Sequence, residues 1–588
     1  MTSQPQNIHQ STFSAAPNQD GSTHYRAQST GFITRTLHGL SKKIRAAGYS
    51  TGLYQYRLRG RHPLQLLASP DDPTIGDATH GQAIIDGTLF YHGHSLPVST
   101  KFWTDIQRCP ADFMAHCHSF SWLQDLAQIA DQRRAQTAAE ILTRSWTKQH
   151  QRWDAYSWAP DLIGRRLINW FTHAPLILSA GDMIYRSSLL SSMAHQSRHL
   201  MRTLADAPRG VPQLYACAGL AVAGYLLPGG KSWKERGLAG LKILAKDFIL
   251  PDGGPASRNL SDAIIAMQTF ILVRDSAIET NSDLPEFIQT TLDRIAPYVR
   301  AMRHKGGAFA QMNGSCADYG LGINSLLARS NATGRPIEKM THTGYQRISH
   351  GQSLLIADCG TPAATDLSYN GHAATGGFEF SAGREQIICS VGHADGFDGM
   401  PGLLKMTRTS AAHSCLVIGD RNMTEIKPDS SLGRGVSRVK TIREESHAGT
   451  KLSISHDGYT RRYKAEHSRI LDVSMDGSNV QGEDQIKGAN LAKLRTAGVV
   501  LRFHLHPDII AKPLNENTII LYLQSGARWI FQAQDAAVHI DDSLYLTTSY
   551  IDTADQMTAT SQIVVTPNVP SFCRWVLKEY SPHDDHNT

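Results

Sequence analysis

The sequence lacks several features that would assign the chain to a common class. It has eight cysteines in 588 residues, and none of them forms a Cys-x-x-Cys pair; this pattern indicates reduced cysteines in the core rather than a disulfide framework. No apolar run approaches the roughly 18 residues of a membrane span. Lys and Arg exceed Asp and Glu by only 58 to 52, and we find no DNA- or RNA-binding motif, so no nucleic-acid partner is indicated.

The N-terminal region is polar and carries no apolar segment of the kind that a secretory signal requires. We therefore expect a cytoplasmic protein, or a periplasmic one if the start is misassigned or export is non-standard. Residues 1–30 are expected to be disordered. Residues 32–49 (FITRTLHGLSKKIRAAGY) carry apolar residues at helical spacing with basic residues between them, which predicts a helix that docks on its own domain or lies on a membrane surface. Residues 80–100 predict short strands and turns.

The period of the apolar residues divides the rest of the chain into two halves. Over residues 119–335 they recur every three or four positions, in seven segments of similar length with short connections. This predicts an incomplete (α/α) toroid of paired helices. Over residues 336–575 the period is two, which predicts a large antiparallel β-sandwich. The expected fold is α+β: a region at 31–118, the toroid, the sandwich and a frayed tail at 576–588.

Several stretches, in this order, resemble the heparinase II/III family of polysaccharide lyases. They are LPDGGPASRN (250–259), NGHAATGGFEFSAGREQIICSVG (370–392), RTSAAHSCLVIGD (408–420), SHDGYTRRYKAEHSRIL (455–471) and LRFHLHP (501–507). The resemblance implies a toroid joined to a sandwich, with a uronate-containing, acidic glycan bound in the cleft between them and cut by β-elimination.

Such a reaction needs a group that neutralises the uronate carboxylate, a base for the C5 proton and an acid for the departing O4. His372 matches the family's sandwich histidine, so the resemblance implies a catalytic role as neutraliser or base. The alternative is a loop histidine bonded to local backbone. Tyr319 and Tyr345 could supply a catalytic phenol, or could be buried, hydrogen-bonded tyrosines.

Four residues are candidates for substrate binding. Arg258 could hold a carboxylate or sulfate, or could pair with an aspartate, Asp252 or Asp262. Asn259 could neutralise the substrate or cap the following helix. The remaining two are Asn313, near the implied cleft or in a routine Asn-Gly turn, and His413, in contact with substrate or structural.

Aromatic and basic residues of the helical half offer further candidates. Trp153 and Trp158 flank a loop-like segment and are the tryptophans most expected to be exposed for stacking on sugar rings, although core packing is the alternative. The neighbours Arg165 and Arg166 could meet sulfates or carboxylates, or could lie on a solvated face.

Two positions depart from the family's pattern. Asp262 stands where the resemblance implies a tyrosine, and Val211-Pro212 stands where it implies an Asn-His pair. An aspartate cannot replace a phenol and would repel a uronate. The alternative function is therefore a catalytically degenerate relative that binds an acidic glycan or envelope polymer without cutting it. A third hypothesis is a scaffold that recruits a partner through residues 32–49.

No redox or nucleotide cofactor is implied by the sequence. A metal is not expected at the catalytic site. Some relatives carry a structural metal in the sandwich, and His504 and His506 could supply ligands on one face of a strand; ordinary strand alternation is the alternative.

Overall fold

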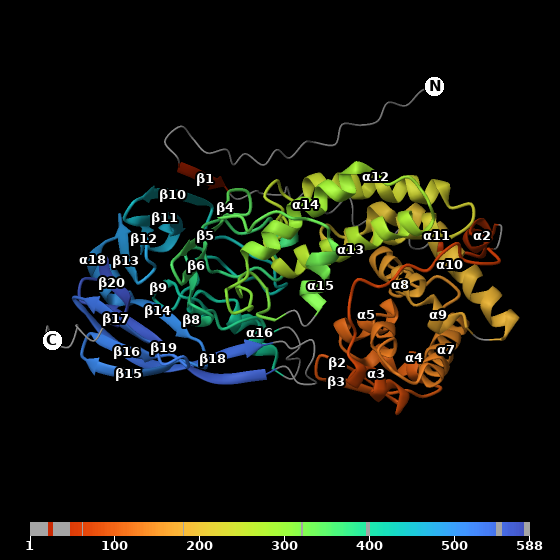
Figure 1. Cartoon of the computed structure of the whole chain (residues 1–588), viewed down its shortest axis with the longest axis horizontal. Helices are drawn as coiled ribbons and strands as arrows, with labels where there is room; N and C mark the ends of the chain where they lie inside the picture. Colours follow the sequence, from red (N-terminus) through yellow and green to blue (C-terminus); the bar gives the residue numbers. More distant parts are fainter. Residues whose placement is uncertain are drawn as a thin grey trace, which may run out of the picture.

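The computed structural model describes residues 22–26, 48–60, 63–179, 181–318, 322–394, 400–547 and 556–580. It is elongated, with helices at one end and stacked β-sheets at the other (Figure 1). The predicted fold class, helices followed by a large antiparallel sandwich, is confirmed.

The long helices follow the apolar periodicity of the first half. Their bounds are α7 Gln132–Gln149, α8 Pro160–Thr172, α9 Ala174–Ile177, α10 Met183–Thr203, α11 Val211–Leu226, α12 Lys231–Asp247, α13 Leu260–Glu279 and α14 Glu286–Ala301. Helices α8 and α11 approach closely because Gly164 faces the carbonyl of Tyr215 and Gly219 faces the carbonyl of Gly164, where an added Cβ would collide. This contact brings Arg165, the residue after Gly164, close to Tyr215.

Shorter elements flank the long helices. They are α2 Gly52–Arg57, α3 Ala78–Ile85, β2 Thr88–Tyr91, β3 His94–Pro97, α4 Phe102–Asp105, the 3-10 turn Ile106–Arg108, α5 Ala111–Ser119, α6 Leu123–Leu126 and α15 Gly322–Arg329. The expectation of short strands and turns over residues 80–100 was wrong for residues 80–85, which belong to helix α3. Asp77 caps this helix by accepting the Thr79 amide at 2.6 Å. One hydrophobic core runs from Leu58 to Ile356, so these elements pack with the long helices.

The sandwich consists of two antiparallel sheets of nine strands each within the described residues. In spatial order the first is β1 Ser22–Arg26, β10 Arg438–Ser446, β11 Gly449–Tyr459, β12 Ala465–Ser474, β13 Asn479–Lys487, β20 Phe572–Glu579, β17 Arg528–Gln534, β16 Thr518–Tyr522 and β15 Ile510–Asn515. The second is β18 Ala536–Thr547, β19 Gln556–Pro567, β14 Val499–Leu505, β8 Glu385–Cys389, β7 Phe378–Ala382, β6 Ser353–Asp358, β5 Tyr345–His350 and β4 Lys339–Met340, with β9 Leu416–Ile418 beside β14. Short helices α16 Pro401–Thr407, α17 Thr460–Tyr463 and α18 Leu491–Ala497 lie in its loops. Between the sheets, Phe378 of β7 stacks on Trp575 of β20 with ring centroids 5.7 Å apart.

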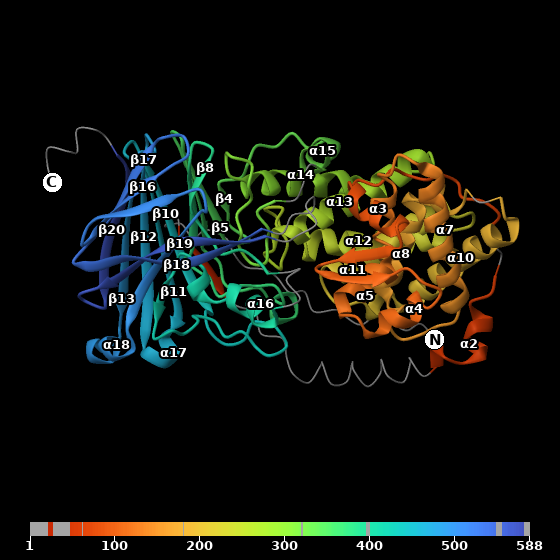
Figure 2. The ribbon, with the colours of Figure 1, turned by 90° about the horizontal axis from the view of Figure 1, so that it is seen from below.

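Two expectations about the chain ends were wrong. Residues 22–26, expected to be disordered, form strand β1, which pairs with Arg438–Ile442 of β10 because that edge of the sheet offers unpaired backbone groups (Figure 1). Seen from below, the helices and the sheets again lie at opposite ends of the molecule (Figure 2). Strand β20 continues to Glu579, past the predicted end of the sandwich at residue 575. The predicted helix over residues 32–49 lies outside the described residues except for its last two positions.

Two further features of the sequence can be followed in the structure. All eight cysteines are free thiols, and seven of them are buried, as expected for core residues. Within the described ranges, no helix is both long enough and apolar enough to span a membrane.

Candidate functional site

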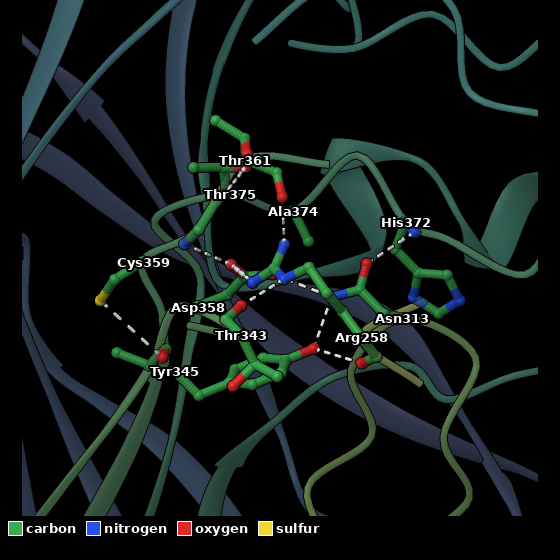
Figure 3. A network of polar contacts seen from close by, with 12 residues as sticks. Arg258, Asn313, Thr343, Tyr345, Asp358, Cys359, Thr361, His372, Ala374 and Thr375 are labelled. Atoms are coloured by element: carbon green, nitrogen blue, oxygen red, sulfur yellow. Dashed lines mark hydrogen bonds and ion pairs between the residues drawn. The ribbon is translucent and has the colours of Figure 1, made fainter. Parts of the chain in front are cut away.

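A buried ion pair joins the helical region to the sandwich. Arg258, in the loop before α13, pairs with Asp358 at the end of β6 (Figure 3). Its other nitrogens donate to the carbonyls of Thr343 and Thr361, at 2.6 and 3.0 Å. The predicted alternative partners of Arg258 were wrong, because the side chain reaches across to the sandwich. Every guanidinium nitrogen is bonded within the protein and only 5% of the residue is exposed, so Arg258 is not accessible to a substrate carboxylate.

Asn313 and Tyr345 extend this network. The Asn313 amide donates to the Tyr345 hydroxyl at 2.7 Å and to Asp358 at 3.0 Å, while Tyr345 donates to the carbonyl of Arg258 at 2.8 Å. Asn313 has a positive φ of 52°, as expected of a turn asparagine. Burial raises the pKa of Tyr345. A phenol that is buried, fully bonded and harder to ionise is a poor base for a substrate proton.

His372 is the central member of a row of three imidazoles. Its backbone N–H donates to Asn313 at 3.0 Å, which ties it to the same network. Its Nδ1 lies 3.0 Å from His413 Nε2, and its Nε2 lies 3.4 Å from His393 Nδ1. Only 3% of His372 is exposed, and burial together with the neighbouring histidines lowers its pKa well below the usual range. We expect it to be neutral at pH 7.

Each contact in this row joins one donor and one acceptor, since a neutral imidazole carries a single N–H. Burial lowers the pKa of His413 to about 3, so we expect it to be neutral at pH 7 as well. The row holds His372 in one orientation, and a catalytic role for His372 stays a prediction.

The other candidates are placed apart from this row. Asn259 caps α13, accepting the Ser261 amide at 2.8 Å. Tyr319 lies outside the described residues. The expectation that Trp158 is exposed was wrong: 2% of it is exposed, and its indole donates to the carbonyl of His150 at 3.0 Å. Trp153 is half-buried, with its ring edge-on to Tyr49 at 5.8 Å.

Two further buried carboxylates fasten the helical region to the sandwich. Asp252 accepts the amides of His342 and Thr343 at 2.8 and 2.7 Å. Glu379 on β7 accepts the backbone amide of Gln311 at 3.0 Å and faces His304 at 3.3 Å. Together with Arg258, these groups make the contact between the two halves, hereafter the junction, a polar and largely internal surface.

The neighbours Arg165 and Arg166 have opposite environments. The prediction that Arg166 lies on a solvated face was wrong. The side chain is fully buried and donates to Gln196 and to the carbonyls of His118 and Ser157. Its guanidinium lies 4.3 Å from the ring of Trp146. Arg165 is half-buried, and its guanidinium lies 5.0 Å from the ring of Tyr215.

The two histidines considered as metal ligands are used otherwise. His504 contacts Ser543 at 2.7 Å and the carbonyl of Ala411 at 2.8 Å, while His506 lies 3.5 Å from Asp508. In the part of the chain that the structure describes, no group of three or more His, Cys, Asp or Glu is arranged to hold a metal ion.

The positions that depart from the family pattern also lie at the junction. Asp262 is in the first turn of α13 and accepts the Ser257 hydroxyl at 2.5 Å; burial raises the pKa of its carboxyl to about 6. Val211 begins α11, directly after Gly210, which lies against Leu367 of the sandwich. The positions at which the resemblance implies a phenol and an Asn-His pair thus hold residues that lack that chemistry.

Sequence reasoning missed several residues that build the site. Asp358 follows an apolar strand, and His393 lies in a second Gly-His-Ala segment, signals that could have been used. Asp484 and Arg469 gave no signal, because they come from separate strands. The Asp484 carboxylate accepts from Arg469 at 2.8 Å. Arg469 donates to the carbonyl of Gly376, four residues after His372, and to that of Ser414, the residue after His413.

Comparison with known proteins agrees with this architecture. Residues 332–578 match the family model described as Heparinase II/III-like, C-terminal. The crystal structure of heparinase III covers 94% of this chain and 92% of its own, at a TM-score of 0.67 and 14% identity. A mutant of the heparan sulfate lyase HepC from Pedobacter heparinus covers 95% and 92%, at a TM-score of 0.61 and 12% identity. The chain therefore has the toroid-and-sandwich fold of these two proteins, and its C-terminal region is similar to the heparinase II/III-like family.

One relative of comparable length is not named as a lyase. FtsZ-localized protein C of Caulobacter vibrioides is 26% identical over 569 residues, which cover 94% of this chain and 95% of the relative. The similarity therefore extends over both the helical region and the sandwich.

Proposed function

We propose that this chain is a non-cleaving member of the lyase fold that localises with FtsZ. The similarity to FtsZ-localized protein C covers 94% of this chain and 95% of that protein, so the two share both halves of the architecture. We also propose a cytoplasmic location, supported by eight free cysteines, which suit a reducing compartment.

The structural observation that carries the proposal is the internal use of two predicted site residues, the substrate-binding candidate Arg258 and the catalytic candidate Tyr345. Arg258 donates to Asp358, and the Tyr345 hydroxyl donates to the carbonyl of Arg258. Both side chains are thus used inside the junction, so neither is available to a uronate. Asp262 stands where the resemblance implies a tyrosine. A carboxylate there repels an anionic substrate and cannot act as the missing phenol. The predicted β-elimination therefore has less support than binding without cleavage.

Binding of an acidic glycan without cleavage is the second candidate function. It is favoured by Arg165, a half-buried arginine that donates to the Ser121 hydroxyl and for which no ion pair is found among the described residues. An arginine in that state has donors to offer to an anionic ligand.

Two measurements test the proposal. A fluorescent fusion of the full chain should form a band with labelled FtsZ at the division site, and a diffuse signal would contradict localisation with FtsZ. Purified protein incubated with heparan sulfate, alginate and bacterial exopolysaccharides should give no ultraviolet absorbance from an unsaturated uronate. A product that disappears in His372→Ala would instead establish the predicted lyase activity.

A further inference from the structure

Arg165 has hydrogen-bonding capacity that the protein does not use. Its Nη2 donates to the Ser121 hydroxyl at 3.2 Å, and its guanidinium lies 5.0 Å from the ring of Tyr215. No ion pair to Arg165 is found among the described residues, whereas Arg166 beside it has an acceptor for each of its three nitrogens. Since a guanidinium carries five N–H donors, Arg165 can still donate to a ligand.

His116 is a second polar group without a partner in the same neighbourhood. It lies on α5 with 6% of its surface exposed, and its Nε2 is buried with no hydrogen bond to any described residue. Its ring stacks on Tyr91 at a centroid distance of 4.0 Å and an angle of 12°, which fixes its orientation. Ser119 links His116 to Ser121: its hydroxyl donates to the carbonyl of His116 at 2.9 Å and lies 2.7 Å from the Ser121 hydroxyl. Burial, with the charge of Arg165, lowers the pKa of His116 well below its usual value. A buried polar atom left unpaired costs free energy that a ligand can recover.

This cluster lies on the side of the helical region that faces the sandwich. Tyr215 is in α11 soon after its N-terminus at Val211. The residues just before that N-terminus contact the sandwich: Gly210 lies against Leu367, and Arg209 pairs with Asp366 at 2.9 Å. The cluster is therefore near the junction but separate from the row of histidines around His372.

We propose that Arg165, Ser121, His116 and Tyr215 form a binding site for one oxyanion, the carboxylate or sulfate of an acidic sugar. Arg165 supplies a planar pair of donors, which matches the geometry of such groups. Ser121 and His116 add polar contacts, and the phenol of Tyr215 closes one side. The sugar as carrier of the oxyanion rests on the second candidate function, glycan binding, and is independent of localisation with FtsZ.

The test is a calorimetric titration of the full-length protein with three tetrasaccharides. One carries uronates only, one is heavily sulfated, and one is neutral. The uronate tetrasaccharide should bind, and the neutral one should not. Arg165→Gln should weaken binding about tenfold or more, since a hydrogen bond to a charged group is lost. Arg461→Gln, at an exposed arginine of α17, is the matched control and should change the affinity less than about twofold.

A second variant keeps the result interpretable. Ser121→Ala removes one small polar group and should weaken binding by about threefold, with an unchanged melting temperature. The proposal is overturned if neither acidic tetrasaccharide binds at millimolar concentration, if the neutral one binds equally well, or if Arg165→Gln binds like the wild type. Localisation of Arg165→Gln with FtsZ should be retained, which separates failure of this site from failure of the proposed localisation.

Discussion

Arg258 of the helical region and Asp358 of the sandwich form an ion pair in which 6% and 2% of the two side chains are exposed. The pair lies at the centre of the junction, and its partners Asn313 and Tyr345 come from both halves. The pair fastens the two halves together, which makes the junction a structural element.

Removal of Arg258 should therefore destabilise the protein strongly. Arg258→Gln leaves Asp358 buried without its cation, and we expect a loss of about 3–5 kcal/mol in the free energy of unfolding. The matched control is Arg209→Gln, which breaks an exposed Arg–Asp pair across the same junction and should cost less than about 1 kcal/mol. Urea denaturation measures both variants, and equal effects would show that Arg258 is not a fastening residue.

The carboxyl of Asp262 should make stability fall as the pH rises. Burial raises its pKa from 3.8 to about 6 in the folded protein, so the folded state binds more protons than the unfolded state between these values. Stability from this group is present at low pH and is lost as the pH rises towards 6. Asp262→Asn should therefore be more stable than the wild type at pH 7.5, and the difference should vanish below about pH 4.

Urea denaturation across this pH range checks the Asp262 prediction. Asp247→Asn, at an exposed position of α12, should follow the wild type within about 0.5 kcal/mol at every pH. An Asp262→Asn difference that does not change with pH would contradict the assignment.

The buried histidines should make the stability of the protein fall as the pH drops, which is the opposite of the effect of Asp262. Burial lowers the pKa of His413 from 6.5 to about 3 and that of His504 to about 4. Since the unfolded state binds more protons below pH 6.5, stability falls as the pH drops, by about 1.4 kcal/mol per pH unit for each histidine. His413→Gln should show a shallower slope between pH 6.5 and 4, whatever its absolute stability. A slope equal to that of the wild type would mean that His413 does not titrate as described.

Asp484 should stabilise the loops that carry His372 and His413 through Arg469, which donates to the carbonyls of Gly376 and Ser414. Its carboxylate accepts from His467 and Arg469 at 2.8 Å each, and nearby positive groups keep its pKa low. Asp484→Asn leaves the buried Arg469 without a counter-charge, and we expect a loss of about 3–5 kcal/mol at pH 7. Because the folded pKa of Asp484 is depressed, this loss should shrink as the pH falls below about 4. Asp472→Asn, on the exposed face of β12, is the control and should be nearly neutral.

The sequence by itself determined the architecture and the order of its parts. Apolar periods of three to four and then two are local properties, and they predicted the helices from α7 to α14 and strands such as β5 and β6. The order of the motifs around Arg258, His372 and His413 was sufficient to predict the family. Asp262 and Val211 could be recognised as departures before any coordinates, because the loss of a phenol is visible in the residue type alone.

Only the tertiary structure decided what the candidate residues do. The partner of Arg258 is 100 residues away in the chain, and that of His372 is 41 residues away, so no local pattern could name them. The burial of Trp158 and the difference between Arg165 and Arg166 depend on which helix packs against each face. Strand β1 forms because a distant edge of the sheet has backbone groups to pair. Hydrogen bonding and burial depend on proximity in space, and the fold brings together residues that the sequence keeps far apart.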